Sequence, residues 1–218
     1  ILRIYGYNNV EINTTLHSSI ITKGNEDRSH KLQNIISEQL VGCGFNEIMN
    51  NSLTAAGYYD ELETYASNNL VRLMNPLSAD LNVLRQTLLF GGLESMQRNI
   101  SRKYSDLSFF EFGNSYRFDA DKRTEDKILS PYSEAYHLAL WMTGDNVSAS
   151  WIDAGRKVTI YDLKAIVEHI FDRLGFKPAA RLVSTFSNDI FTAGLQIQAQ
   201  SNKKVIAQLG IPDMKLPI

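Results

Sequence analysis

Residues 71–119 constrain the fold most, because they predict a strand, a turn, a helix and a second strand in direct succession. Asn75-Pro76 interrupts the first apolar run, since proline lacks an amide donor and disfavours helical geometry in the residue before it. From Leu89 onward, apolar residues recur at the spacing of one helical face, and Thr87 is the expected N-cap. Residues 107–116 are aromatic-rich and bounded by polar residues, which is typical of a strand.

Two other segments predict amphipathic helices that end at a glycine. The first follows Gly24-Asn25, has acidic residues in its first turn and ends at Gly44. Its apolar face consists of Leu32, Ile35, Ile36, Leu40 and Cys43. The second ends at Gly175, and its unbroken apolar face consists of Leu163, Ile166, Val167, Ile170 and Leu174. So regular a face predicts that the second helix packs in the core.

Strands are expected at residues 45–53, at residues 136–143 and in a hairpin that spans residues 195–209. These strands cluster without a regular alternation with helices. We therefore expect an α+β fold, with a mostly antiparallel sheet flanked by helices.

The segments between these elements predict loops and one short helix. Residues 54–63 are expected to form the helix, under two exposed tyrosines, Tyr58 and Tyr59. Residues 119–135 are charged and rich in turn formers, which predicts a mobile loop. Residues 146–158 are expected to be irregular.

Charge and cysteine content exclude some classes of function. The chain has 22 basic and 24 acidic residues, so no global positive field can hold nucleic acid, and any RNA contact must be local or come from a partner. The single Cys43 excludes an intrachain disulfide framework and fits a reducing cytoplasm. No run of about 18 apolar residues exists, so we expect no membrane contact and a cytoplasmic location.

The sequence offers no clear catalytic, cofactor-binding or metal-binding constellation. The paired Gly91-Gly92 is not followed by Lys or Arg, so close helix packing explains it better than a phosphate loop. No Ser/His/Asp or Cys/His arrangement stands out. The histidines lack the spacing of metal ligands: His17, His30, His137 and His169.

Four sequence segments resemble the beta subunit family of bacterial phenylalanyl-tRNA synthetase, in the order in which that family has them. They are RIYGYNNVEI at residues 3–12, NPLSADLNVLRQTLLFGGLESMQRNISR at residues 75–102, LSFFEFGNSYRFD at residues 107–119 and TIYDLKAIVEHIFDRLGF at residues 159–176. The resemblance covers nearly the whole chain. It implies the synthetase-like core of that subunit, with a class II aminoacyl-tRNA synthetase-like fold.

The resemblance also implies a domain division and a role. Residues 1–19 would be the end of a preceding small domain and a connector, and residues 20–218 a non-catalytic core truncated at its C-terminus. In this family catalysis belongs to the alpha subunit, so the fragment alone is expected to be inactive. It would serve as a scaffold in tRNA(Phe) aminoacylation and protein biosynthesis. ATP, magnesium and tRNA would be ligands of the whole ATP-dependent ligase, with no cofactor in this fragment.

Arg117 and Asp119 stand where the resemblance places the class II motif 2, which supplies an arginine to the phosphates of ATP. After the following loop, however, the chain returns as an apolar strand, and motif 3 is missing. These two residues are therefore interpreted as a vestige. The alternatives are a stand-alone RNA-binding module and an ATP-binding module that uses Arg117 and Asp119.

The first long helix followed by a strand resembles motif 1 of class II synthetases, which forms subunit interfaces. On this reading Leu32, Ile35, Ile36 and Leu40 would contact the alpha subunit in an assembly of two alpha and two beta subunits. The alternative is that the helix only packs on its own sheet. An interface predicts that part of this apolar face is exposed in the isolated fragment, and that Ile36→Glu weakens association without unfolding it.

Overall fold

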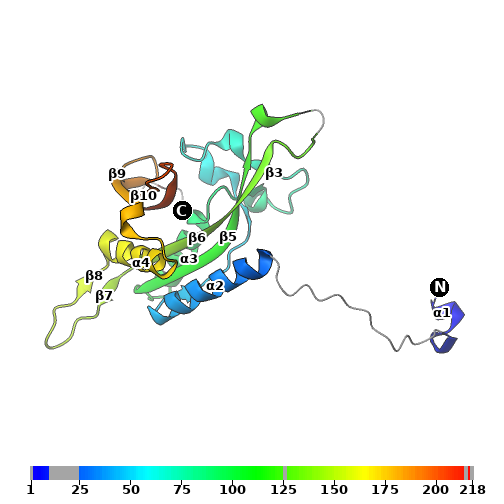
Figure 1. Ribbon diagram of the computed structural model, residues 1–218. Helices are drawn as coiled ribbons and strands as arrows, with labels where there is room; N and C mark the ends of the chain where they lie inside the picture. Colours follow the sequence, from blue (N-terminus) through cyan, green and yellow to red (C-terminus); the bar gives the residue numbers. More distant parts are fainter. Residues whose placement is uncertain (1, 10–24, 125–126, 214–215, 217–218) are drawn as a thin grey trace. The chain divides into compact units, whose positions relative to one another are not determined.

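The computed structural model describes residues 2–9, 25–124, 127–213 and 216 (Figure 1). They divide into two units, residues 1–34 and residues 35–218. The first unit contains α1 (Leu2–Tyr5), a 3₁₀ turn η1 (Tyr7–Asn9) and the first turns of α2 (Asn25–Gly42). The predicted boundary between residues 19 and 20 lies outside the described residues and stays a prediction.

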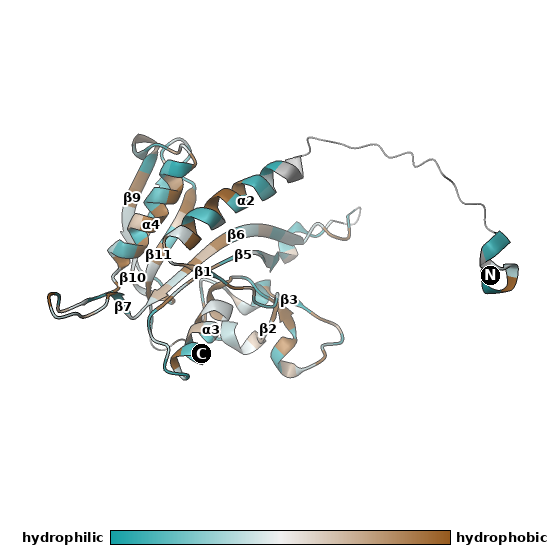
Figure 2. Ribbon diagram, turned by 90° about the horizontal axis from the view of Figure 1, so that it is seen from below, coloured by the Kyte–Doolittle hydropathy of each residue, from teal (hydrophilic) through white to brown (hydrophobic). Residues whose placement is uncertain are grey.

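The central sheet of the second unit is built on two long strands, β5 (Leu107–Phe118) and β6 (Tyr132–Thr143). They pair antiparallel along their whole length, and β1 (Asn46–Glu47) pairs parallel with the other edge of β5. β6 changes from hydrophilic at its beginning to hydrophobic toward its end (Figure 2). The strand expected at residues 136–143 is therefore confirmed, and it begins earlier, at Tyr132.

The strand expected over residues 45–53 is wrong. Only Asn46–Glu47 and β2 (Leu53–Thr54) are extended, and they belong to different sheets. The chain between them turns so that the Asn50 side chain donates a hydrogen bond to Glu111 of β5 (2.7 Å). A tertiary contact therefore replaces the continuous strand.

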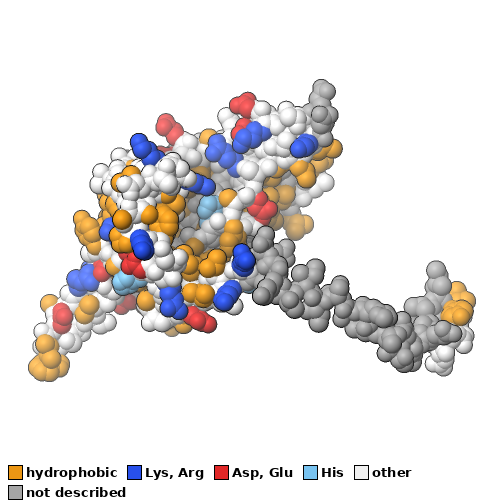
Figure 3. Space-filling view, viewed as in Figure 1, with side chains coloured by type: hydrophobic (Ala, Val, Ile, Leu, Met, Phe, Trp, Pro, Cys, Tyr) orange, Lys and Arg blue, Asp and Glu red, His pale blue; other side chains and the backbone are white. Residues whose placement is uncertain are grey.

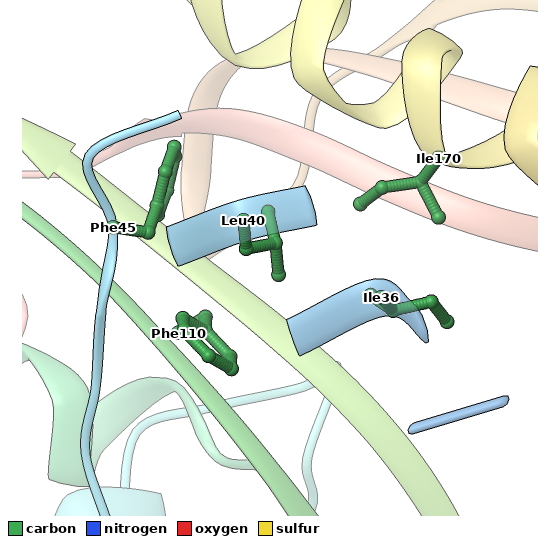
Figure 4. Close-up of a cluster of buried hydrophobic side chains, with 5 residues drawn as sticks. All are labelled: Ile36, Leu40, Phe45, Phe110 and Ile170. Atoms are coloured by element: carbon green, nitrogen blue, oxygen red, sulfur yellow. The ribbon is translucent and has the colours of Figure 1, made fainter. Parts of the chain in front are cut away.

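Helices α2 and α4 (Ile160–Arg173) contribute to the core on one face of the central sheet. The core cluster between them consists of Ile36, Leu40, Phe45, Phe110 and Ile170 (Figure 4). Both helices end as expected, because Gly44 and Gly175 adopt positive φ angles of +85° and +75°. A capping box between Thr159 and Asp162 starts α4.

Helix α3 (Leu89–Ile100) covers the other face of the sheet. It packs through Met96 against Phe109 and Trp141. At Gly92 a Cβ atom would lie 2.0 Å from Cε2 of Trp141, so only glycine allows this approach. Close helix packing, the reason expected for the paired glycines, is confirmed at Gly92.

A small sheet lies beside α3, in the order β2, β4 (Val83–Leu84) and β3 (Val71–Arg72). The helix expected at residues 54–63 is only a 3₁₀ turn, η2 (Ala56–Tyr59). The expected exposure of Tyr59 is wrong, since its ring is fully buried edge-on against Phe90. Burial raises the pKa of Tyr59 to about 12. Further 3₁₀ turns are η3 (Ser67–Asn69), η4 (Ala79–Leu81), η5 (Ala120–Lys122) and η6 (Pro178–Ala180).

The C-terminal sheet has the order β11 (Val205–Pro212), β10 (Phe191–Ala199) and β9 (Arg181–Phe186). The predicted hairpin is confirmed as β10 and β11, whereas β9 was not expected. Val167 of α4 packs on Ile197 and Leu209 of this sheet. The buried Arg181 forms ion pairs with Glu168 and Asp172 of α4, which attach β9 to the helix.

Residues 146–158, expected to be irregular, include a projecting two-stranded arm. Its strands are β7 (Asp145–Val147) and β8 (Arg156–Lys157), and it extends from the body of the second unit (Figure 1). Within the described part of the chain, no helix is long and apolar enough to cross a membrane.

Candidate functional site

The central sheet has one polar face. Side chains alternate along β5, so Phe110 and Phe112 point to the core shared with α2, and Glu111, Ser115 and Arg117 point to the opposite face. A class II synthetase-like fold would need positive charge and free carboxylates on its sheet to bind a nucleotide with its metal ions. The contacts of these side chains therefore decide what this face can do.

A buried ion pair occupies the middle of the polar face. Arg85, which directly follows β4, donates from Nη1 to Oε1 of Glu111 over 2.6 Å, and their side chains are 7% and 1% exposed. The carboxylate also accepts from the backbone N–H (3.3 Å) and the Nδ2 (2.7 Å) of Asn50. Asn50 accepts in turn from the hydroxyl of Ser95 on α3 (3.0 Å). Both oxygens of Glu111 are therefore used inside the chain.

The backbone groups and the Nε of Arg85 are also hydrogen-bonded within the chain. Its N–H donates to the carbonyl of Ser52 and its carbonyl accepts from Tyr116, each over 2.9 Å, while Nε donates to the carbonyl of Asn114 (3.0 Å). At Gly113 a Cβ atom would lie 2.2 Å from Nη2 of Arg85. Glycine at this position lets the guanidinium group lie flat on β5. Arg85 thus covers the strand where a ligand would have to bind.

A serine and a histidine lie farther along the same sheet. Nε2 of His137 on β6 is 2.9 Å from the hydroxyl of Ser115 on β5. Burial lowers the pKa of His137, which favours the neutral imidazole. Among the described contacts, no carboxylate bonds to the other ring nitrogen, so the orienting acid of a catalytic triad is missing. Sequence inspection missed this pair because only the register of β5 and β6 brings the two residues together.

The two motif 2-like residues have local partners. Asp119 accepts from the backbone N–H of Asp121 (3.3 Å) and forms an ion pair with Lys122 (3.2 Å). The hydrogen bond from Lys122 holds the pKa of this half-buried carboxyl below its usual range. Arg117 is exposed, and its Nη2 lies 3.1 Å from the side-chain amide group of Asn69, which accepts a hydrogen bond when its oxygen is turned toward the guanidinium group. Asp119 therefore serves as the cap of η5.

The apolar face of α2 has two parts. Ile36 is 9% exposed and Leu40 is fully buried, so both belong to the chain's own core. Leu32 is 49% exposed and Ile35 is half-buried, and only these two of the predicted interface residues are available to a partner. Cys43, assigned to the apolar face, is exposed instead. The expectation that Ile36→Glu leaves the fold intact is therefore wrong, because a carboxylate would enter the core.

No group of three or more His, Cys, Asp or Glu side chains that could hold a metal ion lies among the described residues. His17 falls outside them. His30 and His169 are exposed on α2 and α4.

Comparison with solved structures shows the fold. The pyrrolysyl-tRNA synthetase PylSc of Desulfitobacterium hafniense matches with a TM-score of 0.57 at 14% identity, over 83% of this chain and 55% of that one. A crystal structure of pyrrolysyl-tRNA synthetase from the same organism matches with a TM-score of 0.53 at 15% identity, over 78% of this chain and 55% of that one. The fold is that of a class II aminoacyl-tRNA synthetase-like core.

Comparison with sequences shows the family. The phenylalanine–tRNA ligase beta subunit of Bacteroides fragilis is 58% identical over 216 residues, which are 99% of this chain and 26% of that protein. The beta subunit of Porphyromonas gingivalis is 44% identical over 203 residues, 93% of this chain and 25% of that protein. The chain thus spans about a quarter of the length of these relatives. The model of the phenylalanyl tRNA synthetase beta chain CLM domain matches residues 12–213, and the chain belongs to that family.

Proposed function

We propose that this chain is a non-catalytic, synthetase-like scaffold within the beta subunit of a phenylalanine–tRNA ligase in the cytoplasm. Its role is to bind the catalytic alpha subunit, in a heterotetramer of two alpha and two beta subunits, and so to support tRNA(Phe) aminoacylation. The names of the relatives support this assignment. Because those proteins are about four times as long, tRNA binding and catalysis are assigned to the whole assembly and not to this part.

The observation that carries the scaffold role is the buried pair of Arg85 and Glu111. In a working nucleotide site the arginine and the carboxylates of the sheet are free to meet phosphates and metal ions. Here Glu111 accepts three hydrogen bonds from within the chain, and the pair is almost completely buried. Each of the two buried charges is tolerated because the other pairs with it, so the pair belongs to the folded core and not to a ligand site.

The residues on the sheet do not fit ATP with magnesium. Arg117 is the one motif 2-like arginine, but Asp119 beside it caps a 3₁₀ turn and pairs with Lys122. The comparisons give no support to a stand-alone ATP-binding or RNA-binding module. We therefore assign ATP, magnesium and the chemical step to the alpha subunit, with no cofactor in this chain.

Co-purification tests this function. The full-length beta chain is expressed with a tagged alpha subunit, and the two are expected to purify together in constant ratio. Leu32→Glu places a charge on a half-exposed apolar position of α2 and is expected to weaken the association, as apolar anchors dominate such interfaces. Glu38→Gln, at an exposed position of the same helix, is the matched control. A wild-type beta chain that never retains the alpha subunit would overturn the proposal.

A further inference from the structure

The arm formed by β7 and β8 presents two large apolar side chains to solvent. Trp151 is 93% exposed and Ile152 is 74% exposed, both in the loop that joins the strands. Hydrophobic side chains gather at the tip of the arm (Figure 3). A tryptophan side chain offers on the order of 150–250 Å² of surface, so leaving it in water forgoes a large hydrophobic gain. An adjacent exposed isoleucine makes the tip a patch.

The loop that holds these side chains is closed by hydrogen bonds within itself. The hydroxyl of Ser150 accepts from the backbone N–H groups of Ile152 (3.3 Å) and Asp153 (3.1 Å), and the N–H of Ser150 donates to the carbonyl of Asp153 (2.8 Å). Oδ1 of Asp153 accepts from the N–H of Gly155 (2.9 Å), which adopts a φ of +78°. These four hydrogen bonds hold the loop in one conformation. A preorganised loop loses little entropy when its apolar tip docks.

The charges of the arm are neutralised within the chain. Lys157 pairs with Asp145 (2.7 Å) and Arg156 with Asp162 (2.8 Å). The hydrogen bonds that the two bases donate to these carboxylates raise the pKa of both bases. Single-stranded nucleic acid requires an excess of cations that neutralise phosphates beside the stacking aromatic, and in residues 145–157 two bases are balanced by two acids, Asp145 and Asp153. The neutral tip therefore matches an apolar pocket on a protein.

The base of the arm and the chain that leaves α2 both lie beside the beginning of β5. At the base of the arm, the N–H of Asp145 donates to Oδ1 of Asp106 (2.9 Å). The chain that leaves α2 reaches the same region, because Asn46 of β1 pairs with Phe109 of β5. Val41, in the last turn of α2, is 59% exposed. A partner that contacts Val41 at the end of α2 therefore meets the same end of the central sheet as the base of the arm.

We propose that the arm inserts Trp151 and Ile152 into a neutral apolar pocket of the alpha subunit. The proposal rests on the proposed function, and it adds a second anchor separate from α2. The arm projects from the body of the unit and so can reach into a neighbouring chain (Figure 1). The aromatic anchor at its tip is of the kind that dominates binding energy at interfaces.

The experiment uses the full-length beta chain and the alpha subunit. The Trp151→Ala, Ile152→Ala double variant is expected to raise the Kd of assembly about 30-fold or more, which corresponds to about 2 kcal/mol. Leu77→Ala, which removes an equally exposed apolar side chain at another site, is expected to leave the Kd unchanged. In the wild-type chain, backbone hydrogen exchange in residues 148–154 is expected to slow when the alpha subunit is added.

Two results would overturn this inference alone. The first is a double variant that assembles with the wild-type Kd, while the wild-type chain still binds the alpha subunit. The second is slower exchange at the tip on addition of tRNA or lipid vesicles but not of the alpha subunit. If the wild-type beta chain fails to bind the alpha subunit at all, the proposed function fails with it.

Discussion

Glu111→Gln is the sharpest test of the buried ion pair. The glutamine keeps the shape of the side chain and one acceptor oxygen, but it removes the charge that balances Arg85. It also places an amide NH₂ group opposite Nδ2 of Asn50, which now donates to the carboxylate over 2.7 Å. Two donors would then face each other, and the guanidinium group would stay buried without its counter-ion.

The expected cost follows from burial. The side chains of Arg85 and Glu111 are 7% and 1% exposed, so solvent cannot replace the lost partner. Removing one member of a buried pair typically costs about 3–5 kcal/mol, whereas replacing both by apolar residues is often neutral or stabilising. The double variant Arg85→Met, Glu111→Leu should therefore be more stable than Glu111→Gln.

Urea unfolding measured by circular dichroism gives the free energies of unfolding. Glu134→Gln is the matched control, because this glutamate is exposed on β6, and its cost should stay within about 0.5 kcal/mol. A loss of less than about 1 kcal/mol for Glu111→Gln would mean that water reaches Arg85. The claim that the pair closes this face of the sheet would then be refuted.

Two further predictions concern packing and pH. Gly92→Ala would place a Cβ atom 2.0 Å from the Trp141 ring and should lower the free energy of unfolding in urea by about 1–3 kcal/mol. In the control Gly42→Ala the new Cβ atom meets no atom within 4 Å, so this variant should be neutral or stabilising. Equal unfolding midpoints for the two variants would contradict the packing of α3. The hydrogen bond from Arg156 holds the pKa of Asp162 in the folded chain below its value in the unfolded chain. The Asp162 carboxylate therefore stabilises the fold fully above its unfolded-state pKa, and this stabilisation is lost as the pH falls through its folded-state pKa. The difference in unfolding free energy between wild type and Asp162→Asn should be largest near neutral pH and shrink below about pH 4, and a difference independent of pH would contradict this role.

The features that the sequence determined by itself are local. The presence of α3 and α4 follows from apolar residues at helical spacing, although Leu88 and not the expected Thr87 is the N-cap of α3. Gly44 and Gly175 end α2 and α4 because a positive φ angle suits glycine. The hairpin of β10 and β11 follows from alternation on both sides of a polar turn. Each of these depends on neighbours a few residues apart, and the four sequence segments added the family and fold class.

Tertiary structure decided the features that join distant parts of the chain. Tyr59 lies in a polar segment, and only its packing on Phe90 buries it. β9 has mostly exposed side chains and is a strand because β10 pairs with it. The same holds for the polar face of the sheet, where Arg85 and Glu111 are 26 residues apart in sequence. A charged residue shows no local sign of its partner, since the free energy that buries it comes from contacts made only when the sheet and α3 assemble.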